Sequence, residues 1–427
     1  QRQMCIRDRI VIDEEHEPTY KSEQTPRYHA RETALRRAQT EGASVVLGSA
    51  TPSMEAMYRA KNGEYVLMEM KNRSKMQDPA EVYTVDMRKE LKNGNRSILS
   101  EQLQRLMKER LEKKEQTMLF LNRRGYAGFI SCRSCGYVVK CPHCDVSLSS
   151  HRGGRLVCHY CGYEEPMIQN CPSCGSHFIG GFRAGTQQIE ELVKRQFPQA
   201  GVLRMDMDTT RNKDGHEKIL ETFENGGADI LIGTQMIVKG HDFPNVTLVG
   251  ILAADLSLYS DDYRSAERTF QILTQAAGRA GRGKREGEVV IQTYSPEHYS
   301  IEKAAAQDYE GFYQEEMNYR ELMGYPPAEH LMAVLMMGAE EEHLSLAAKY
   351  LKEYTLRIDR EQKLQVIGPA SPYVGKVNDV YRKVLYLKCE TIDPLIDAKN
   401  KMEKYIEINR GFQSIRIQFD LDPMNIF

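Results

Sequence analysis

The sequence lacks several features that mark whole classes of protein. No apolar run approaches the roughly 18–20 residues that span a bilayer, so a membrane-spanning protein is not expected. The opening residues, QRQMCIRDR, contain no apolar segment of the kind found in secretory signals. The formal net charge of -2 over 427 residues excludes a uniformly basic surface but allows a local groove for nucleic acid. The composition therefore predicts a soluble globular protein, and we expect a cytoplasmic location.

A second absence concerns phosphate binding. The GxxxxGK[ST] loop, whose backbone N–H groups cradle nucleotide phosphates, occurs nowhere in the chain, and GRGKRE and YVGKVN do not fit it. Near its start the chain nevertheless has the apolar run Ile10–Ile12 followed by DEEH, Asp13 to His16. Residues 1–9 have neither a strand nor a helix pattern, and we interpret them as a truncation remnant or a scar. The phosphates of a nucleotide would then sit on a part that this sequence lacks.

Cysteine is concentrated in one segment. Of the ten cysteines, eight lie between Cys132 and Cys174, whereas Cys5 and Cys389 stand alone. A secreted disulfide scaffold would distribute its cysteines along the chain, so a tight cluster points to metal binding in a reducing compartment. The segment contains four CxxC pairs, separated by five, thirteen and nine residues, that begin at Cys132, Cys141, Cys158 and Cys171.

Each CxxC pair can form a knuckle that aims two thiolates at one ion. Tetrahedral Zn²⁺, with Zn–S distances of about 2.3 Å, needs two knuckles, so four knuckles predict two closed, structural sites. The spacing leaves the pairing open. The thirteen-residue gap favours a ribbon of knuckles two and three, nested inside knuckles one and four, whereas sequential pairing requires a turn within GYVVK. A glycine follows the second cysteine of three knuckles, where a turn needs room: Gly136, Gly162 and Gly175. Redox-active or free CxxC pairs are the less favoured alternative, and eight thiolates suffice without His143, His151 and His159.

The DEEH stretch places carboxylates directly after a β-favouring apolar run. Carboxylates at a strand end commonly hold Mg²⁺ beside a nucleotide, and Asp13 would do so through water. Glu14 can orient or deprotonate the water that attacks the γ-phosphate, and His16 would couple the nucleotide site to neighbouring groups. An exposed acidic turn is the alternative interpretation of this stretch taken alone.

Two further stretches suit a nucleotide-driven motor. GSATPS, residues 48–53, follows an apolar strand, and its hydroxyls can hydrogen-bond the DEEH motif; alternatively it is a routine turn in which Ser53 caps a helix. In QAAGRAGRG, residues 275–283, Arg279 and Arg282 are expected on one helical face, where guanidinium groups can bind phosphate bidentately. An arginine supplied from a second lobe accelerates phosphoryl transfer by roughly 10³–10⁵-fold. Alternatively, the small residues of this stretch form a helix contact and the arginines point into solvent.

Strand and helix patterns alternate along most of the chain, which predicts parallel α/β sheets. Helices are expected in YHARETALRRAQTEG, from Met54, and in SEQLQRLMKERLEKKE with Ser100 as its cap. The last hundred residues change to a β-α-β-β-α-β order, typical of a ferredoxin-like sandwich. The expected parts are a remnant or scar (1–9), the end of a first α/β lobe (10–72), a charged connector (73–97), a second α/β lobe (98–130 and 180–312), an inserted zinc module (131–179) and a C-terminal α+β domain (313–427).

In this order, DEEH, GSATPS and QxxGRxxR are similar to the motif set of superfamily-two helicases. More specifically, the chain resembles the family of primosomal protein N′, the PriA replication-restart DNA helicases, over essentially all of its length after Arg9. The stretches that carry the resemblance are VIDEEHEPTYKSEQTPRYHAR, LGSATPS, FLNRRGYAG with the CxxC series directly behind it, GTQQIEE, DILIGTQMIVKGHDFPNVTLVG and QAAGRAGR. The resemblance implies an α/β fold: the remnant of a RecA-like helicase lobe 1, a RecA-like lobe 2 with an inserted double zinc-binding module, and a small α+β, ferredoxin-like C-terminal domain.

The resemblance also implies roles for particular residues. The catalytic set would be Asp13, Glu14, Glu15, His16, Arg279 and Arg282. Coupling between ATP and DNA would fall to Gly48, Ser49, Ala50, Thr51, Gly233, Thr234, Gln235, Lys239, Gln275 and Gly278. An aromatic-rich loop and an arginine pair supply the DNA-binding candidates Tyr20, Lys21, Arg27, Tyr28, Arg123 and Arg124. Bases stacked on such rings contribute about 1–3 kcal/mol each, although an ordinary surface loop with tyrosines is the alternative. The nested pairing of the family puts Cys132, Cys135, Cys171 and Cys174 on one Zn²⁺, and Cys141, Cys144, Cys158 and Cys161 on the other.

The implied activity is an ATP-dependent 3′→5′ DNA helicase of replication restart, which assembles primosomes at stalled forks. Its implied cofactors are two Zn²⁺, with Mg²⁺ and ATP in the full-length protein. Its implied partners are forked or single-stranded DNA, the single-stranded DNA-binding protein and other primosome proteins, and no membrane. Because this chain lacks the phosphate loop and the family's N-terminal DNA-binding domain, we expect it to hydrolyse ATP poorly by itself. The alternatives are a non-enzymatic fragment that binds DNA and primosome proteins, against which the intact motifs argue, and another zinc-ribbon DNA translocase.

Overall fold

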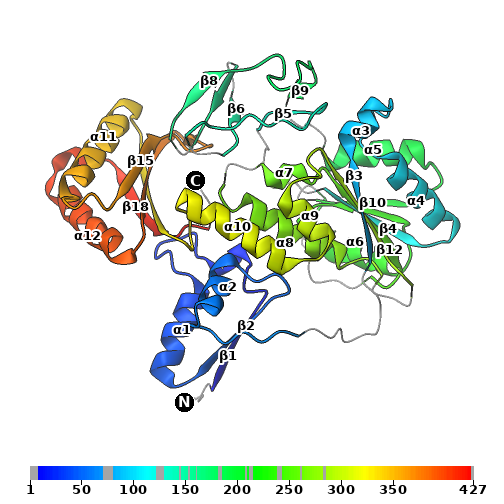
Figure 1. The fold of residues 1–427 in the computed structure, drawn as a ribbon, viewed down its shortest axis with the longest axis horizontal. Helices are drawn as coiled ribbons and strands as arrows, with labels where there is room; N and C mark the ends of the chain where they lie inside the picture. The colour runs from blue at the N-terminus through cyan, green and yellow to red at the C-terminus, as the bar shows by residue number, and fades with distance from the viewer. Residues whose placement is uncertain are drawn as a thin grey trace. The chain divides into compact units, whose positions relative to one another are not determined.

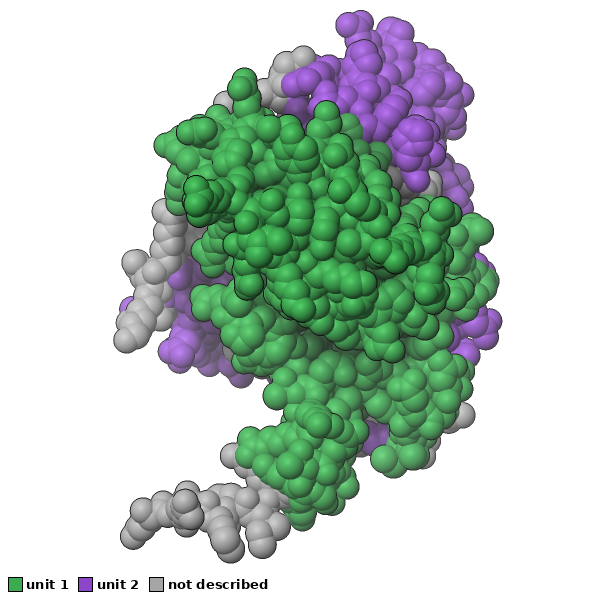
Figure 2. Space-filling view, turned by 90° about the vertical axis from the view of Figure 1, so that its left-hand side faces the viewer, with its two compact units in different colours: residues 1–69, 159–162, 316–427 green, residues 70–158, 163–315 purple. Residues whose placement is uncertain are grey.

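The ribbon in Figure 1 follows a computed structural model of the 427-residue chain. The residues that it describes are 8–70, 80–121, 129–143, 146–151, 154–159, 161–180, 185–206, 209–210, 215–237 without the side chain of Gln235, 243–259, 262–281 and 285–424. The chain divides into two compact units, coloured green and purple in Figure 2. Unit 1 comprises residues 1–69, 159–162 and 316–427, and unit 2 comprises residues 70–158 and 163–315.

Unit 1 begins with a two-stranded parallel sheet and two helices. Its elements are β1 (Arg9–Asp13), the 3₁₀ turn η1 (Pro18–Tyr20), α1 (Ala30–Glu41), β2 (Ser44–Gly48) and α2 (Met54–Lys61). The register pairs Arg9 with Ser44 and Asp13 with Gly48, so the DEEH and GSATPS motifs leave the same edge of this sheet. The hydroxyl of Ser53 accepts the N–H of Ala56 at 3.2 Å and caps α2, as the sequence predicts.

The C-terminal part of unit 1 is a four-stranded antiparallel sheet with two long helices and a short extra strand. Its elements are β14 (His330–Gly338), α11 (Glu341–Ile358), β15 (Gln365–Ala370), β16 (Lys376–Val377), β17 (Val380–Cys389), α12 (Ile392–Ile408), the 3₁₀ turn η3 (Arg410–Phe412) and β18 (Arg416–Leu421). The sheet order β15-β17-β14-β18 confirms the ferredoxin-like arrangement predicted from the sequence. Apolar residues of both helices, such as Leu351 and Met402, share one core with Val334 and Leu385 of the sheet.

Unit 2 contains a six-stranded, fully parallel sheet in the order β10-β11-β4-β12-β13-β3. Its strands are β3 (Glu81–Asp86), β4 (Gln116–Leu121), β10 (Val202–Met205), β11 (Ile230–Gly233), β12 (Val246–Leu252) and β13 (Glu288–Thr293). Its helices are α3 (Met87–Lys92), α4 (Glu101–Glu112), α5 (Thr186–Gln196), α6 (Gly215–Glu224), η2 (Gln235–Ile237), α7 (Asp255–Leu258), α8 (Ser265–Ala277) and α9 (Tyr299–Ala305). Helix α10 (Tyr309–Met323) begins in unit 2 and ends in unit 1.

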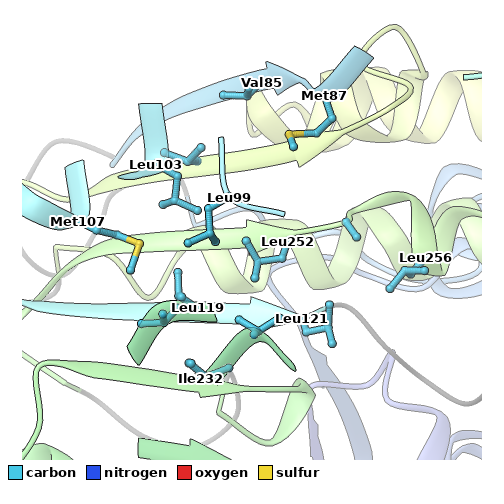
Figure 3. Packing of buried hydrophobic residues seen from close by; sticks show 14 of the residues in the cluster. Val85, Met87, Leu99, Leu103, Met107, Leu119, Leu121, Ile232, Leu252 and Leu256 are labelled. Atoms are coloured by element: carbon cyan, nitrogen blue, oxygen red, sulfur yellow. The ribbon is translucent and has the colours of Figure 1, made fainter. Parts of the chain in front are cut away.

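Helices cover both faces of the unit 2 sheet, with α4 and α5 on one side and α6 and α8 on the other (Figure 1). Figure 3 shows Leu103 and Met107 of α4 packed over Leu119 and Leu252 of the central strands. Every residue of β4 and β12 is buried, as expected for strands covered on two faces. Ser100 caps α4 by accepting the N–H of Leu103 at 3.2 Å, which confirms the predicted cap.

The predicted connector 73–97 differs from the structure. Residues 81–86 form β3, which pairs in parallel with β13 at the edge of the unit 2 sheet, and α3 follows at once. The stretch EVYTVD contains the β-favouring residues Val82, Tyr83 and Val85, but it is short and charged residues lie on both sides of it. Part of the predicted connector therefore belongs to the unit 2 sheet.

The cysteine segment folds into short antiparallel ribbons within the sequence of unit 2. Its strands are β5 (Ser131–Cys132), β6 (Ser149–His151), β7 (Arg155–Val157), β8 (Glu164–Pro166) and β9 (Ile179–Gly180). Strand β5 pairs with β9, and β6, β7 and β8 form a separate three-stranded sheet. Across all the described residues, no helix is both long and apolar enough to cross a membrane.

Candidate zinc centres and nucleotide-site motifs

Four thiols from the first and last knuckles converge on one point. The sulfur atoms of Cys132, Cys135, Cys171 and Cys174 all lie within 4.8 Å of one another. Cys132 Sγ lies 3.7 Å from Cys174 Sγ, and Cys135 Sγ lies 3.6 Å from Cys171 Sγ. A tetrahedral ion with Zn–S bonds of about 2.3 Å requires sulfur–sulfur edges of about 3.8 Å, so this cluster fits Zn²⁺. Disulfide bonds are excluded for these pairs because the distances are too long.

A second thiol group comes from the middle knuckles. The sulfur atoms of Cys141, Cys158 and Cys161 lie within 4.8 Å of one another. Cys144, the fourth ligand expected here, lies outside the described residues. Neither group includes a histidine among the described residues. The thiols are therefore brought together in the nested arrangement, knuckle one with four and knuckle two with three.

The knuckle backbones show why thiolates suit these positions. Gly136, Gly162 and Gly175 have φ of 80°, 81° and 71°, a left-handed conformation that favours glycine. The thiols of the four-cysteine cluster differ. Burial raises the pKa of Cys171, but backbone N–H groups of Cys174 and Ser173 outweigh it and lower the pKa to about 7, whereas burial raises the pKa of Cys132 and raises that of Cys135 to about 12. Backbone donors aimed at sulfur stabilise the thiolate, which is the form that binds metal.

The first knuckle is anchored on the lobe of unit 2. Arg88 of α3 donates to the carbonyl of Cys135 at 3.3 Å and to both carboxylate oxygens of Glu297 at 2.9 Å. Arg133 Nε donates to the hydroxyl of Tyr294 at 3.1 Å. A Cβ on Gly136 would lie 2.4 Å from the carbonyl oxygen of Tyr294, so only glycine allows this close approach. These contacts hold the first knuckle of the zinc module against the end of β13.

In unit 1, Glu15 joins the DEEH and GSATPS motifs. Its side chain is buried, and its two carboxylate oxygens accept from the backbone N–H of Ser53 at 2.6 Å and from the Ser53 hydroxyl at 3.0 Å. Arg31 of α1 lies 3.1 Å from the same carboxylate and also donates to the Ser53 hydroxyl at 2.9 Å. These contacts indicate that Glu15 holds the motifs together, whereas the sequence placed it in the catalytic set.

His16 makes the second connection between the motifs. Its Nδ1 lies 2.7 Å from the hydroxyl of Ser49, which also accepts the N–H of Thr51 at 3.0 Å. The predicted hydrogen bonding between GSATPS hydroxyls and DEEH is therefore confirmed. Asp13 and Glu14, by contrast, remain accessible to solvent. Glu14 has φ of 47°, a strained conformation for a non-glycine residue that commonly marks a functional site.

The aromatic-rich loop, residues 17–29, is held close to this motif. The Tyr20 hydroxyl donates to the carbonyl of Asp13 at 2.8 Å, whereas the side chain of Tyr28 is 54% exposed. Two of the DNA-binding candidates have internal partners. Lys21 and Arg27 both form ion pairs with the buried carboxylate of Asp420, at 3.0 and 2.8 Å. Within this loop, Lys21 and Arg27 therefore have an internal acidic partner, whereas the ring of Tyr28 is open to solvent.

In unit 2, the predicted coupling residues follow β11. Gly233 ends this strand, and a Cβ there would lie 2.8 Å from the carbonyl oxygen of Met205, so the position requires glycine. Thr234 is half-buried, and its carbonyl accepts the N–H of Ile237 at 3.1 Å. Because ligands of parallel α/β sheets bind beyond the carboxyl ends of the strands, this edge is where a nucleotide or DNA contact is expected.

The arginine motif differs from the sequence prediction in one respect. Helix α8 ends at Ala277, and Arg279 lies in the turn after it, so Arg279 does not sit on a helical face. Gly278 is exposed and Gln275 is half-buried. Gly281 has φ of 71°, and a Cβ there would lie 2.5 Å from the backbone nitrogen of Gly287. The glycines of the motif therefore end the helix and close a tight loop, which the helical pattern alone did not reveal.

Five predicted site residues lie outside the described residues: Arg123, Arg124, Cys144, Lys239 and Arg282. Of Gln235, only the backbone is described. The remaining predicted residues fall into the groups above, with Asp13–His16 and Gly48–Thr51 in unit 1 and Gly233, Gln275 and Arg279 in unit 2.

Sequence reasoning missed Asp255 and Arg31. Asp255 follows β12, and its carboxylate accepts from the hydroxyl of Thr293 at 2.8 Å and the N–H of Tyr294 at 2.9 Å. Burial raises the pKa of Asp255 above its ordinary value, against the effect of these hydrogen bonds. An acid directly after the apolar run VTLVGILAA resembles the signal that identified DEEH, so Asp255 could have been found; Arg31 carried no comparable signal.

Family models match three parts of the chain. Residues 141–166 match the PriA DNA helicase Cys-rich region (CRR) domain. Residues 181–284 match the helicase conserved C-terminal domain, and residues 321–424 match the primosomal protein N C-terminal domain. These segments contain the second thiol group, the β11 and α8 motifs, and the ferredoxin-like sheet.

Curated relatives match nearly the whole chain. Replication restart protein PriA of Bacillus subtilis (strain 168) is 46% identical over 415 residues, which are 97% of this chain and 51% of the relative. Its counterpart in Synechocystis sp. is 40% identical over 427 residues, or 98% of this chain and 51% of the relative. The chain belongs to the PriA family. It spans about half the length of these PriA relatives.

Among solved structures, that of RecG bound to a three-way DNA junction is 14% identical and covers 73% of this chain and 30% of RecG, with a TM-score of 0.37. A score this low supports no inference. Membership of the PriA family therefore rests on the sequence relatives and the family models, and the RecA-like lobe of unit 2 on its matched helicase domain.

Proposed function

We propose that this chain is the C-terminal part of an ATP-dependent 3′→5′ DNA helicase of replication restart. The observation that carries the proposal is the difference in burial between the side chains of the DEEH motif. Glu15 and His16 are buried and tied to Ser53 and Ser49, whereas Asp13 remains exposed beside them. The buried pair Glu15 and His16 holds the end of the strand in place, so accessible carboxylates there can hold Mg²⁺ and position water for phosphoryl transfer.

Roles follow for this chain's own residues. Asp13 would hold Mg²⁺ through water, Glu14 would orient the attacking water, and Arg279 would stabilise charge on the γ-phosphate. Gly233 and Thr234 would lie between nucleotide and DNA. The first and last knuckles would bind one structural Zn²⁺ and the middle knuckles the other, which fixes the ribbon without supplying chemistry.

We also propose the domain boundaries: a first-lobe segment over 10–72, a second lobe over 98–130 and 180–312, to which we add the edge strand β3, and a C-terminal domain over 313–427. Because no GxxxxGK[ST] loop occurs in these 427 residues, we propose that the chain alone does not hydrolyse ATP efficiently. Forked or single-stranded DNA, the single-stranded DNA-binding protein and other primosome proteins are the proposed partners of the whole protein.

The test uses the natural protein that contains this chain. Glu14→Gln and Arg279→Ala should each lower DNA-stimulated ATP turnover by about 10³-fold or more, while the affinity for forked DNA stays within about twofold of the wild type. Lys349→Gln, at an exposed position of helix α11 in the C-terminal domain, is a control without a proposed role in turnover. Loss of DNA affinity with turnover per bound molecule unchanged would contradict the role assignment.

A further inference from the structure

Asp420 is a buried acid with two cationic partners from a distant part of the sequence. It lies in β18 of the C-terminal sheet, opposite Ala333, and it is only 4% exposed. Its two carboxylate oxygens face different cations. Lys21 Nζ lies 3.0 Å from Oδ1, and Arg27 NH1 lies 2.8 Å from Oδ2.

Backbone and side-chain contacts strengthen the same connection. Lys21 Nζ also donates to the carbonyl of Leu421 at 2.7 Å, and Arg27 NH2 donates to the side-chain oxygen of Gln418 at 3.4 Å. The side chains of Lys21 and Arg27 are only 10% and 14% exposed, so water screens these interactions weakly. Three residues of β18 thus offer four acceptor atoms to one loop.

That loop leads directly to the DEEH motif. The N–H of Glu17 donates to the carbonyl of Glu14 at 2.9 Å, and the Tyr20 hydroxyl donates to the carbonyl of Asp13 at 2.8 Å. Lys21 is the next residue after Tyr20 and pairs with His29 across the loop. A displacement of Lys21 would therefore move the residues that hold Asp13 and Glu14.

We propose that Asp420 is a positioning residue, through which the C-terminal domain fixes the aromatic-rich loop and with it the geometry of Asp13 and Glu14. The structural half of this proposal stands on the contacts alone, and its effect on ATP turnover rests on the proposed function. A neutral side chain of the same shape leaves two enclosed cations without their carboxylate, so the loop should leave its place on β18.

The first test is hydrogen exchange on the 427-residue chain. Asp420→Asn should speed amide exchange in residues 17–29 by about tenfold or more, and Asp420→Glu should restore part of the protection. Asp422→Asn is the matched control, because Asp422 pairs with His330 at 3.0 Å and accepts the N–H of Leu331 without contacting the loop in any described bond. Exchange in 17–29 that stays within twofold of the wild type would overturn the proposal.

Faster exchange in α11 and α12 as well would show that Asp420→Asn unfolds the C-terminal sheet as a whole. In that case the pair Lys21→Met and Arg27→Met replaces it. These changes remove the same interaction from the loop side. They should free residues 17–29 and leave α11 and α12 protected, and an unchanged loop would again overturn the proposal.

The second test is ATP turnover by the natural protein that contains this chain. Asp420→Asn should lower the DNA-stimulated kcat about tenfold, with KM for ATP and DNA affinity nearly unchanged, and adding Lys21→Met should cause little further loss. Tighter DNA binding by Asp420→Asn would instead mean that Asp420 masks DNA-binding cations, and would overturn the proposal. If the wild-type protein shows no turnover, the proposed function fails, while the exchange test still decides the positioning role.

Discussion

The two units hold their strand-end acids in different ways. In unit 2, Asp255 follows β12, a strand buried along its whole length at the centre of a six-stranded sheet. In unit 1, DEEH follows β1, one of two strands, and Val11 of this strand is 64% exposed. The first acid is supported by apolar burial, and the second is supported mainly by charged and hydrogen-bonded side chains.

This difference shows that two acids at strand ends can be held in place by different kinds of interaction. The contacts of Glu15 with Ser53 and Arg31, of His16 with Ser49, and the Asp420 ion pairs are hydrogen bonds and ion pairs between buried or half-buried groups. The core around β4 is instead held by interdigitated apolar side chains. Mutations that remove apolar volume should therefore affect the surroundings of β12 and Asp255 most, and those that remove charge should affect the surroundings of β1 and DEEH most.

The largest effect is expected where metal holds the chain. Structural Zn²⁺ contributes about 10–16 kcal/mol to the folding of small zinc domains. Chelation should therefore unfold residues 132–174, while amide protection in β4, β12 and the C-terminal sheet persists. Released zinc, counted with an indicator during hydrogen exchange, should approach two ions per chain. A simultaneous melt of both units on metal removal would contradict the separation of module and lobes.

The next largest effect tests how much apolar burial stabilises the unit 2 sheet. Phe120 is fully buried in β4, so Phe120→Ala should lower the free energy of unfolding of unit 2 by about 3–5 kcal/mol. Val11→Ala, at an exposed position of β1, should change stability by less than about 0.5 kcal/mol. Urea denaturation followed by amide exchange in β4 and β1 measures both. Equal losses at the two sites would remove the distinction between the units.

The contribution of charged contacts to the DEEH region is tested at Arg31. Arg31→Met leaves the buried carboxylate of Glu15 without its cation, which should destabilise the DEEH region by about 3 kcal/mol. Arg37→Met removes a surface pair with Glu41 and should cost less than about 0.5 kcal/mol. Exchange rates of amides in β1 and α2 report both changes. If the two substitutions had the same effect, the Glu15 network would not be what supports the motif.

The smallest effect is a pH dependence shared by both units. His29 caps α1 and His298 caps α9, each accepting a backbone N–H, and burial lowers the pKa of both to about 4, with help from Arg31 and Lys140 respectively. The unfolded state, with a pKa near 6.5, takes up protons first, so stability is lost as the pH falls from about 6.5 to about 4. His29→Asn and His298→Asn, which keep a cap acceptor, should flatten this dependence in denaturation at pH 7, 5 and 4. An unchanged slope would contradict the assignment.

Local patterns were readable from the sequence because their causes are local. The caps at Ser53 and Ser100, the left-handed glycines of the knuckles and the order of the C-terminal elements follow from neighbouring residues. The hydrogen bonds between DEEH and GSATPS could be predicted because both motifs end strands that pair in parallel.

Other features depend on contacts that no local pattern encodes. Asp420 meets Arg27 across 393 residues, so Lys21 and Arg27 looked like free cations for DNA. The end of α8 before Arg279 depends on the close approach of Gly281 to Gly287. The edge strand β3 was hidden because its partner β13 lies about two hundred residues away and both flanks are charged.

The most direct test of the account measures ATP turnover by the 427-residue chain and by the natural protein that contains it, with and without forked DNA and with zinc counted in each preparation. We predict two zinc ions in both, DNA-stimulated turnover in the natural protein and none in the chain alone. DNA-stimulated turnover by the chain alone would mean that residues within it hold the phosphates, and would contradict the role given to its DEEH motif.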